Sequence, residues 1–282
     1  MRKVKYKIGN SFVDYNLEGK VTQGKDEVLL EKDINLLQNS DFNNEGYSIH
    51  PFLSEEMFTK IKSGITDIIK SLLIKVGCNI SSHFTLEKYH TYVSDEEHLK
   101  LAMEIQNGWN VSEFPVDFKQ IDERMSELLD FEVTTFAPHI NYNNFFLRII
   151  RPNKLQDNNP PHRDVWIDRL RNAINIYAPI CGSNKNSSLP IMPSTHMLSE
   201  SKIQRSESGA ILNGIKYTVP CALFVNNDML EMVRPDVKEN EIMIFSPYLI
   251  HGGGANLNED VTRISLEVRF FPKNIDLLER YN

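Results

Sequence analysis

Three residues in the second half of the chain could together bind a divalent metal ion. His162 and Asp164 are separated by one residue, and His251 lies far downstream, after a strand-like segment. In an extended segment, residues i and i+2 point to the same side, so His162 and Asp164 can face one ion while Arg163 points away. Two imidazoles and one carboxylate on one face of Fe(II) leave three positions open for other ligands. The pattern therefore predicts a metal site with catalytic potential at His162, Asp164 and His251.

Arg263 lies on the next strand-like segment after His251, and Ser265 follows it on the same side of that segment. A guanidinium is a planar fork that can pair with a carboxylate through two hydrogen bonds. A 2-oxo acid can chelate the metal through its keto oxygen and adjacent carboxylate, which leaves one position for dioxygen. Arg263 would then bind the far carboxylate of 2-oxoglutarate, and Ser265 could add a hydrogen bond. The spacing predicts Fe(II) as cofactor and 2-oxoglutarate as cosubstrate.

The first half of the chain predicts helices that would support such a site. Ser54 is a favourable N-cap, and acidic residues follow it in the first turn, where the helix dipole favours them. Apolar residues then recur at helical spacing as far as Gly77, which is expected to follow the helix end. Two further helices are expected over residues 95–106 and 117–129.

From residue 132 onward the pattern changes to short strands separated by turn-forming residues. Four such segments cover residues 145–150, 173–178, 241–245 and 263–270. A helical first half followed by many short strands favours an α+β fold with a β-barrel or jelly-roll core. We expect one domain over residues 45–282, with a helical part at about 45–131 and a β core at about 132–272.

Residues 1–44 are expected to form an N-terminal extension without chemistry of its own. A short strand at residues 5–13 and a short helix at 27–37 are compatible with its polar, mixed sequence. The extension could be a capping flap or an interface, and both interpretations stay open at this point.

The bulk composition restricts the class of partner. The chain has 282 residues, a net charge of -7 and a pI of about 5.7, which argues against nucleic acid as a partner. No apolar run is long enough to cross a membrane, and the N-terminus lacks an apolar signal segment. The three cysteines are scattered and form no C-x-x-C pair, which is typical of reduced thiols in a cytoplasmic protein.

The segment from about residue 45 to 272 resembles the phytanoyl-CoA dioxygenase-like branch of the Fe(II)/2-oxoglutarate-dependent oxygenases. The resemblance rests on His162-Arg163-Asp164, on the strand at 175–178, on the turn LPIMPSTH at 189–196, and on the distal segment from His251 to Arg269. The opening of the segment, residues 45–54, is also similar to the usual start of this family. The chain departs from the family at Arg163, where Gln is common, and at Pro193-Ser194-Thr195, where Pro-Gly-Ser is usual.

This resemblance implies a double-stranded β-helix, a jelly-roll or cupin-like core, flanked by N-terminal helices. It implies that His162, Asp164 and His251 bind iron and that Arg263 binds the C5 carboxylate of 2-oxoglutarate. Asn175 and Tyr177 lie on a strand that often contributes cosubstrate contacts in such enzymes. The implied reaction oxidises an unactivated C–H bond of a small metabolite, by hydroxylation or otherwise, with release of succinate and CO₂.

Other functions stay open from the residues alone. Two histidines and an aspartate also suit Zn²⁺ and a bound water, as in a zinc-dependent hydrolase, although Arg263 has no evident role there. A non-catalytic barrel that binds a metal or small ligand is a second alternative. An anionic substrate is one option, because several arginines lie near the first ligands in sequence. They are Arg148, Arg151, Arg163, Arg169 and Arg171, and paired or solvated charges are the plainer interpretation.

Overall fold

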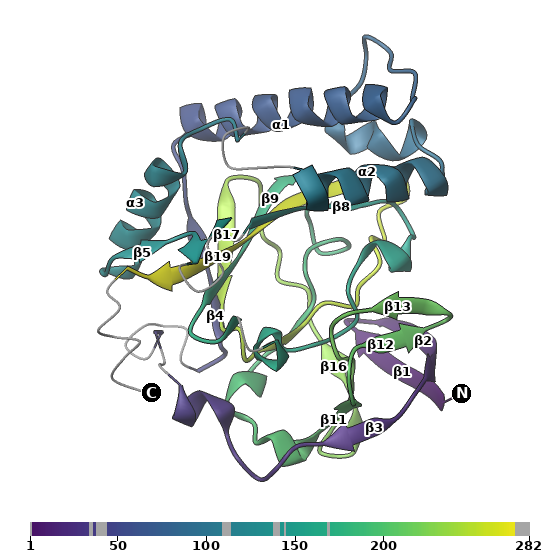
Figure 1. Cartoon of the computed structure of the whole chain (residues 1–282), viewed down its shortest axis with the longest axis vertical. Coiled ribbons are helices and arrows are strands. Elements are labelled where there is room, and N and C mark those ends of the chain that lie inside the picture. The colour runs from purple at the N-terminus through teal and green to yellow at the C-terminus, as the bar shows by residue number, and fades with distance from the viewer. Residues whose placement is uncertain are drawn as a thin grey trace.

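A computed structural model describes the chain at residues 2–33, 36–37, 44–108, 114–137, 142–143, 145–167 and 170–273. Figure 1 shows helices on one side of a central sheet and the N-terminal strands toward the opposite end of the molecule. The helices are α1 (Glu55–Lys75), α2 (Asp95–Gly108) and α3 (Phe118–Leu129). The predicted α+β class, with helices before most of the strands, agrees with this arrangement.

The central sheet has the strand order β4-β17-β9-β19-β8, and each neighbouring pair is antiparallel. Its strands are β4 (Tyr47–Pro51), β8 (Phe145–Ile150), β9 (Ile174–Cys181), β17 (Glu241–Phe245) and β19 (Arg263–Pro272). The four strands predicted after residue 132 all occur here. Strand β19 also pairs with β5 (Val133–Thr134) near its end.

Strand β19 separates the two faces of this sheet chemically. Ile264, Leu266, Val268 and Phe270 alternate with the polar residues and pack with the helices in one apolar core. The polar set, which consists of Arg263, Ser265, Glu267 and Arg269, must therefore lie on the opposite face. That second face is the one that can carry chemistry, because the first is covered by α1, α2 and α3.

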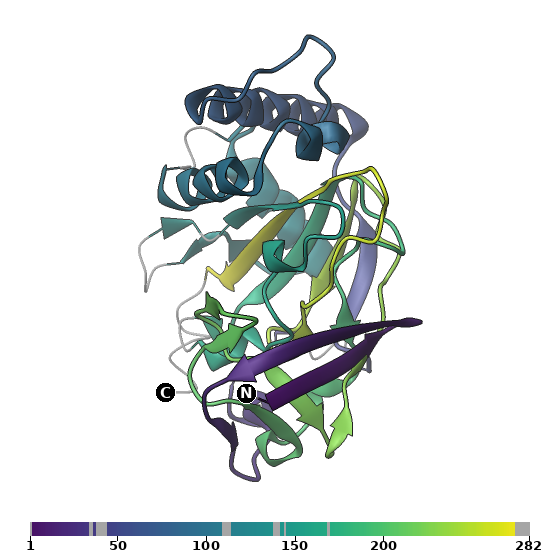
Figure 2. The same ribbon diagram turned by 90° about the vertical axis from the view of Figure 1, so that its right-hand side faces the viewer.

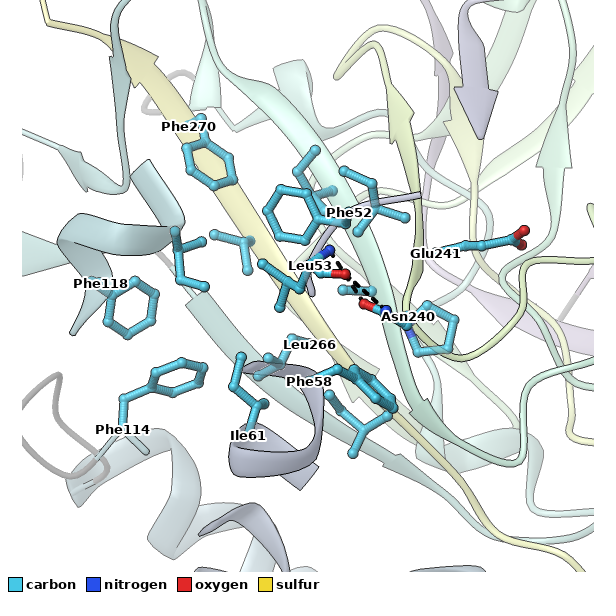
Figure 3. A pocket seen from close by; sticks show the side chains of 17 residues that line it. Phe52, Leu53, Phe58, Ile61, Phe114, Phe118, Asn240, Glu241, Leu266 and Phe270 are labelled. Carbon is cyan, nitrogen blue, oxygen red and sulfur yellow. Dashed lines mark hydrogen bonds between the residues drawn. The ribbon is translucent and has the colours of Figure 1, made fainter. Parts of the chain in front are cut away.

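Helix α1 begins where its cap was expected, since the Ser54 hydroxyl accepts a hydrogen bond from the Met57 backbone amide at 3.2 Å. A small apolar cavity of about 40 Å³ lies between α1, α3 and the covered face of the sheet. Figure 3 shows the rings of Phe58, Phe114 and Phe118 around it. Because its walls are almost entirely apolar, it provides packing surface rather than chemistry.

The N-terminal residues form more β-structure than expected. The strand predicted at residues 5–13 is wrong: β1 (Arg2–Ile8) and β2 (Ser11–Glu18) form an antiparallel hairpin that turns at Gly9, where φ is +56°. The helix predicted at 27–37 is also wrong, because its described part holds only a 3-10 turn at Leu29–Lys32. Alternating polar and apolar residues across a tight turn explain the hairpin.

The hairpin is joined to distant parts of the chain. β1 pairs in parallel with β16 (Glu231–Met232), and β2 pairs with β12 (Ala210–Leu212). β3 (Val21–Gln23) pairs with β11 (Ile203–Ser206). In Figure 2 the hairpin runs across the end of the molecule that is remote from α1. Residues 2–23 are thus part of the β-structure of the later sequence.

The remaining strands are short and belong to smaller sheets or strand pairs. They are β6 (Phe136–Ala137), β7 (Tyr142–Asn143), β10 (Ile191–Met192), β13 (Ile215–Tyr217), β14 (Ala222–Val225), β15 (Asp228–Met229) and β18 (Ile250–His251). Cys78, Cys181 and Cys221 are buried free thiols. Among the described helices, none is both long and apolar enough to cross a membrane.

Candidate metal centre

A β-bridge brings the two predicted histidine ligands together across 89 residues of sequence. The backbone amide of His162 donates to the carbonyl of His251 at 2.9 Å, and the reverse bond measures 3.0 Å. The two imidazole centroids lie 4.4 Å apart. Because β18 also pairs with β10, His251 is held from both sides. The turn-and-strand context predicted for these residues is what places them side by side.

Asp164 completes a compact triad with the two imidazoles. Its Oδ1 lies 3.2 Å from Nε2 of His162 and 3.7 Å from Nε2 of His251. One donor atom from each residue lies within 4.8 Å of the other two, and all three side chains are buried. Of the described residues, this is the group that could hold a metal ion. The structure thus brings the three predicted residues together, and their binding of a metal stays a prediction.

Both imidazoles are oriented by backbone carbonyls. Nδ1 of His162 lies 2.7 Å from the Pro160 carbonyl oxygen, and Nδ1 of His251 lies 2.9 Å from that of Leu249. Since a carbonyl oxygen only accepts, each Nδ1 must carry the proton. In the neutral ring, the lone pair is then on Nε2, the atom that faces Asp164. This is the tautomer that a metal ligand needs.

The second oxygen of Asp164 is bound by residues that the sequence analysis did not assign to it. Oδ2 accepts hydrogen bonds from Asn175 at 2.9 Å and from Arg269 at 3.0 and 2.7 Å. Burial alone would raise the pKa of Asp164, but Arg269 and the two imidazoles hold it well below its usual range. The carboxylate is therefore ionised at neutral pH, with Oδ1 turned toward the histidines.

Burial lowers the pKa of His251 to about 4, with a further contribution from the neighbouring His162. Burial similarly lowers the pKa of His98, on α2, to about 4. In the unfolded chain both would titrate near 6.5, so the unfolded state binds more protons below that pH. Their contribution to stability is complete above pH 6.5 and is lost as the pH falls toward 4.

We therefore expect the metal-free protein to lose on the order of 1–2 kcal/mol of unfolding free energy per histidine between pH 7 and 5. Urea unfolding at the two pH values measures this loss. The variant His98→Asn should lose correspondingly less than the wild type. An identical pH dependence in the variant would contradict the assignment to His98.

A glycine turn after His251 fits against the rest of the site. Gly253 has φ of +80°, and an added Cβ would lie 2.5 Å from the Pro161 ring and 2.6 Å from the Tyr6 hydroxyl. The Tyr6 hydroxyl donates to the Gly253 carbonyl, and it lies 2.8 Å from the Tyr15 hydroxyl. The N-terminal hairpin thus braces the turn that follows a metal ligand. This contact depends on strand pairing between segments far apart in the sequence, and no local sequence signal indicates it.

Gly253→Ala is expected to destabilise the protein by about 2 kcal/mol or more, because strain from positive φ adds to the clash with Pro161 and Tyr6. Gly214→Ala is the matched control, since Gly214 has the same φ of +80° and open space at its Cβ. It should cost only about 1 kcal/mol. Thermal unfolding compares the two, and equal losses would show that the close approach at Gly253 has no energetic weight.

Arg263 and Ser265 form a buried polar group without partners. Within the described chain, none of the three guanidinium nitrogens of Arg263 has a hydrogen-bond partner, and neither does Oγ of Ser265. Both residues are 0% exposed. The guanidinium carbon of Arg263 lies 5.4 Å from the ring centre of Tyr177. A buried cation without a hydrogen-bonding partner is costly, so an anion would be favoured at this position.

A second cation lies near Arg263. Arg234 donates to the carbonyls of Ser188 and Ala255, and its Nε has no partner within the described residues. Burial, together with the charge of Arg263, lowers the pKa of Arg234 to about 10. A buried guanidinium and a partly buried one in the same region increase its preference for a negative charge.

Two cavities adjoin the triad. The larger, of about 240 Å³, is bounded by His162 and Asp164 on one side and reaches Leu170 and Val219. The smaller, of about 20 Å³, touches both histidines and Asn175. Arg148 and Arg269 are in the walls of both cavities. The candidate metal position therefore opens onto space that a small molecule can enter.

Asn175 and Tyr177, the two predicted cosubstrate contacts on β9, lie in different surroundings. Asn175 lies at the centre, where it binds Asp164, and its own Oδ1 has no partner within the described residues. Tyr177 is fully buried, and its hydroxyl lies 3.0 Å from that of Ser183. Their predicted contacts with a cosubstrate stay predictions.

Most of the arginines clustered near the first ligands are paired with carboxylates. The pairs are Arg148 with Glu267, Arg151 with Asp157 and Asp95, Arg163 with Glu200, and Arg171 with Asp33. Arg169 lies outside the described residues. Arg163 is 0% exposed and also donates to the carbonyl of Thr195, so the residue that departs from the family pattern connects the metal segment to the following turn.

Comparison with known proteins finds no matching family model and no matching curated protein. Among solved structures, AviO1 from Streptomyces viridochromogenes Tue57 is 15% identical, with a TM-score of 0.45 over 82% of this chain and 92% of that one. EctD from S. alaskensis, solved with 2-oxoglutarate and 5-hydroxyectoine, is 10% identical, with a TM-score of 0.46 over 92% and 86%.

SnoN, a non-heme alpha ketoglutarate dependent epimerase from nogalamycin biosynthesis, is 13% identical, with a TM-score of 0.40 over 82% of this chain and 79% of that one. These identities and TM-scores are too low to assign a function to this chain. Its chemistry has to be inferred from its own side chains.

Proposed function

We propose that this protein is an Fe(II)- and 2-oxoglutarate-dependent oxygenase that oxidises a C–H bond of a small molecule. The observation that carries the proposal is the coexistence of two features. One is a buried His162–Asp164–His251 triad, and the other is a buried Arg263 that has no anionic partner among the described residues. A metal site alone is compatible with several reactions, whereas the buried cation calls for a carboxylate as well.

The fold that we infer for this function is a double-stranded β-helix. The central sheet supplies one layer, and we infer that the β10–β18 pair opposes its polar face. Ile191 of β10 and Leu249, which precedes β18, pack with Tyr177 and Met243. The ligands lie between these layers. We infer a jelly-roll core with helices outside it, as a single domain over residues 45–282 to which the N-terminal extension, residues 1–44, adds strands β1, β2 and β3.

The donor set fits Fe(II). Nε2 of both histidines and Oδ1 of Asp164 converge from one side, and the remaining atoms of these groups are occupied by hydrogen bonds. Two imidazoles and one carboxylate on one face leave positions for exogenous ligands. His162, Asp164 and His251 would hold the ion, and Arg269 and Asn175 would keep Asp164 oriented.

The buried polar group on β19 fits 2-oxoglutarate. A dicarboxylate chelated at the metal needs a cation for its far end, and Arg263 offers its whole donor set, with the Ser265 hydroxyl beside it. Both lie on the same face of β19 as Glu267 and Arg269, which line the smaller cavity at the triad. Asn175 Oδ1 and the Tyr177 ring adjoin the same region.

Iron and 2-oxoglutarate, once bound, supply the oxidising chemistry from dioxygen, with succinate and CO₂ as co-products. The chain itself orients the metal ligands and keeps water away from them. Carbonyls fix the imidazole tautomers, Arg269 keeps Asp164 ionised, and burial of the triad excludes water from all but the cavity side. The cavity of about 240 Å³ would place a substrate C–H bond next to the ion. Retention of Asp164 favours hydroxylation, desaturation, ring formation or epoxidation over halogenation.

A small-molecule substrate is supported by the size of this cavity, and the acidic net charge of -7 argues against nucleic acid. Three buried free cysteines are those expected of a reducing, cytoplasmic location. The zinc hydrolase and the non-catalytic barrel are less well supported, since neither accounts for a buried guanidinium without a partner.

The proposal is tested by single-turnover chemistry. Protein loaded anaerobically with Fe(II) and 2-oxoglutarate is mixed with oxygenated buffer, and succinate and CO₂ are measured. We expect both products with Fe(II) and neither with Zn(II). If Asp164→Ala forms as much succinate and CO₂ with Fe(II) as the wild type does, the proposal is contradicted. Ester or amide hydrolysis with Zn(II) alone would favour the hydrolase.

A further inference from the structure

The cavity of about 240 Å³ is lined by both apolar and polar residues. Phe146, Ile167, Leu170 and Val219 are the apolar ones. Arg148, Arg269, Asn159 and Thr218 provide polar groups, and His162 and Asp164 mark the metal end. A ligand that fills this space needs an apolar portion and a group that accepts hydrogen bonds.

Arg148 and Arg269 each use only part of their donor set. Arg148 binds Glu267 through Nε at 3.2 Å and Nη2 at 3.0 Å, and Arg269 binds Asp164 through Nε and Nη2. Within the described residues, Nη1 of neither arginine has an acceptor. Their side chains are 23% and 11% exposed, respectively, so neither is sealed. The free donors thus belong to side chains that form the cavity wall.

The charges around the cavity favour an anion once the site is assembled. The cations Arg148 and Arg269 are balanced by Glu267 and Asp164. Arg148 holds the pKa of Glu267 down at about 2 against the opposing effect of burial, so this pair is ionised at neutral pH. A divalent ion would balance the two charges of 2-oxoglutarate, which leaves the positive charge of Arg263. A surplus positive charge in a partly buried site attracts a negative ligand.

We propose that Arg148 and Arg269 form an oxyanion subsite that receives a carboxylate or phosphate group of the substrate, while its apolar portion packs on Ile167, Leu170 and Val219. The proposal rests on the proposed function, because it takes this cavity as the substrate site. The shared chemistry is a planar or tetrahedral oxyanion that accepts from Nη1 of the two arginines. Arg151, Arg163 and Arg171, which pair with carboxylates elsewhere, do not line this cavity.

The substrate is not identified, so the test uses simple probes. Benzoate and phenyl phosphate carry the two oxyanions on an apolar ring, and benzamide is the neutral counterpart of benzoate. Each is titrated calorimetrically into Ni(II)-loaded protein with saturating 2-oxoglutarate. We expect benzoate or phenyl phosphate to bind at least roughly tenfold more tightly than benzamide, as charge-assisted hydrogen bonds provide.

Paired variants separate the guanidinium from net charge. Arg148→Gln/Glu267→Gln removes one charge of each sign and keeps a neutral hydrogen-bonding pair, so it should weaken oxyanion binding roughly tenfold or more. Glu267→Gln alone removes the carboxylate that pairs with Arg148 and should tighten oxyanion binding. Lys154→Gln, which removes an exposed charge paired with Asp95, is the control and should change nothing. Circular dichroism and Ni(II) affinity confirm that each variant is folded.

Equal binding of benzoate and benzamide, or no detectable oxyanion binding, would overturn the subsite. So would a double variant that binds like the wild type. The same titrations are repeated without 2-oxoglutarate in the wild type and in Arg263→Gln. They show whether the probe binds at Arg263 instead of at Arg148 and Arg269. If Fe(II) fails to turn over 2-oxoglutarate but the probe still depends on Arg148, the proposed oxygenase function fails while the oxyanion subsite stands.

Discussion

His162→Ala is expected to lower the affinity for Fe(II) by more than about a hundredfold, because altering even outer partners of a metal ligand costs ten- to a hundredfold. The variant keeps Asp164 and His251, but two donors cannot occupy one face of the ion. The backbone bridge between residues 162 and 251 does not depend on the side chain, so the fold should persist. Anaerobic calorimetric titration with Fe(II) measures the loss.

His83→Ala is the control, because His83 is exposed and belongs to no group of potential metal ligands in the described part of the chain. Its affinity for Fe(II) should equal that of the wild type. A folded His162→Ala protein that binds Fe(II) as tightly as the His83 variant would show that the triad does not hold the metal.

Arg263→Met is expected to have two effects of opposite sign. It should weaken 2-oxoglutarate binding by roughly 30-fold or more, since removing one partner of a buried charge pair costs 2–5 kcal/mol. It should also stabilise the protein when neither metal nor cosubstrate is present, because the native guanidinium is 0% exposed and has no partner among the described residues. Calorimetry measures the first effect and thermal unfolding of the metal-free protein the second.

Arg163→Met is the matched comparison. Arg163 is also 0% exposed, but it is paired with Glu200. Its loss leaves Glu200 Oε1 without its ion-pair partner, while Oε2 keeps the hydrogen bond from Trp166, and should cost about 3 kcal/mol. If Arg263→Met destabilises the metal-free protein as much as Arg163→Met and leaves 2-oxoglutarate affinity intact, then Arg263 is a structural residue and not an anion site.

The metal ligands could be predicted because their chemistry depends on residue type and local spacing. His162 and Asp164 lie on one side of an extended segment, and Arg163 indeed has extended backbone angles of φ -105° and ψ 134°. His251 could not be placed by local spacing, since only a β-bridge between distant segments brings it to His162. The sequence placed His251 after a strand and before a flexible turn, which was sufficient to single it out.

The residues that orient Asp164 were harder to predict. Arg269 binds Asp164 from 105 residues away, and nothing near it in sequence marks it as different from other strand arginines. The alternation of β19 does place Arg263, Ser265, Glu267 and Arg269 on one face, and that signal was present in the sequence. Alternation cannot show which strand pairs with β19. Because the neighbour is β8, Arg148 lies close to Glu267.

The N-terminal residues illustrate the same limit. β1 and β2 are a local hairpin, but their value to the site comes from Tyr6, whose hydroxyl reaches the Gly253 carbonyl. Such a contact depends on the pairing of β1 with β16, which joins segments more than 200 residues apart. Conversely, Ser194 shows what a family departure can mean structurally, since it adopts φ of +63°, where the similar turn usually carries glycine.

The most direct test of the central claim is an anaerobic titration of the metal-free protein with Fe(II) and 2-oxoglutarate, followed by visible absorption. Chelation of the 2-oxo acid to Fe(II) should produce a metal-to-ligand charge-transfer band that saturates at one equivalent of iron and is absent in His162→Ala. In Arg263→Met the band should need far more 2-oxoglutarate. A folded wild-type protein that develops no band at saturating concentrations of both components would contradict the oxygenase assignment.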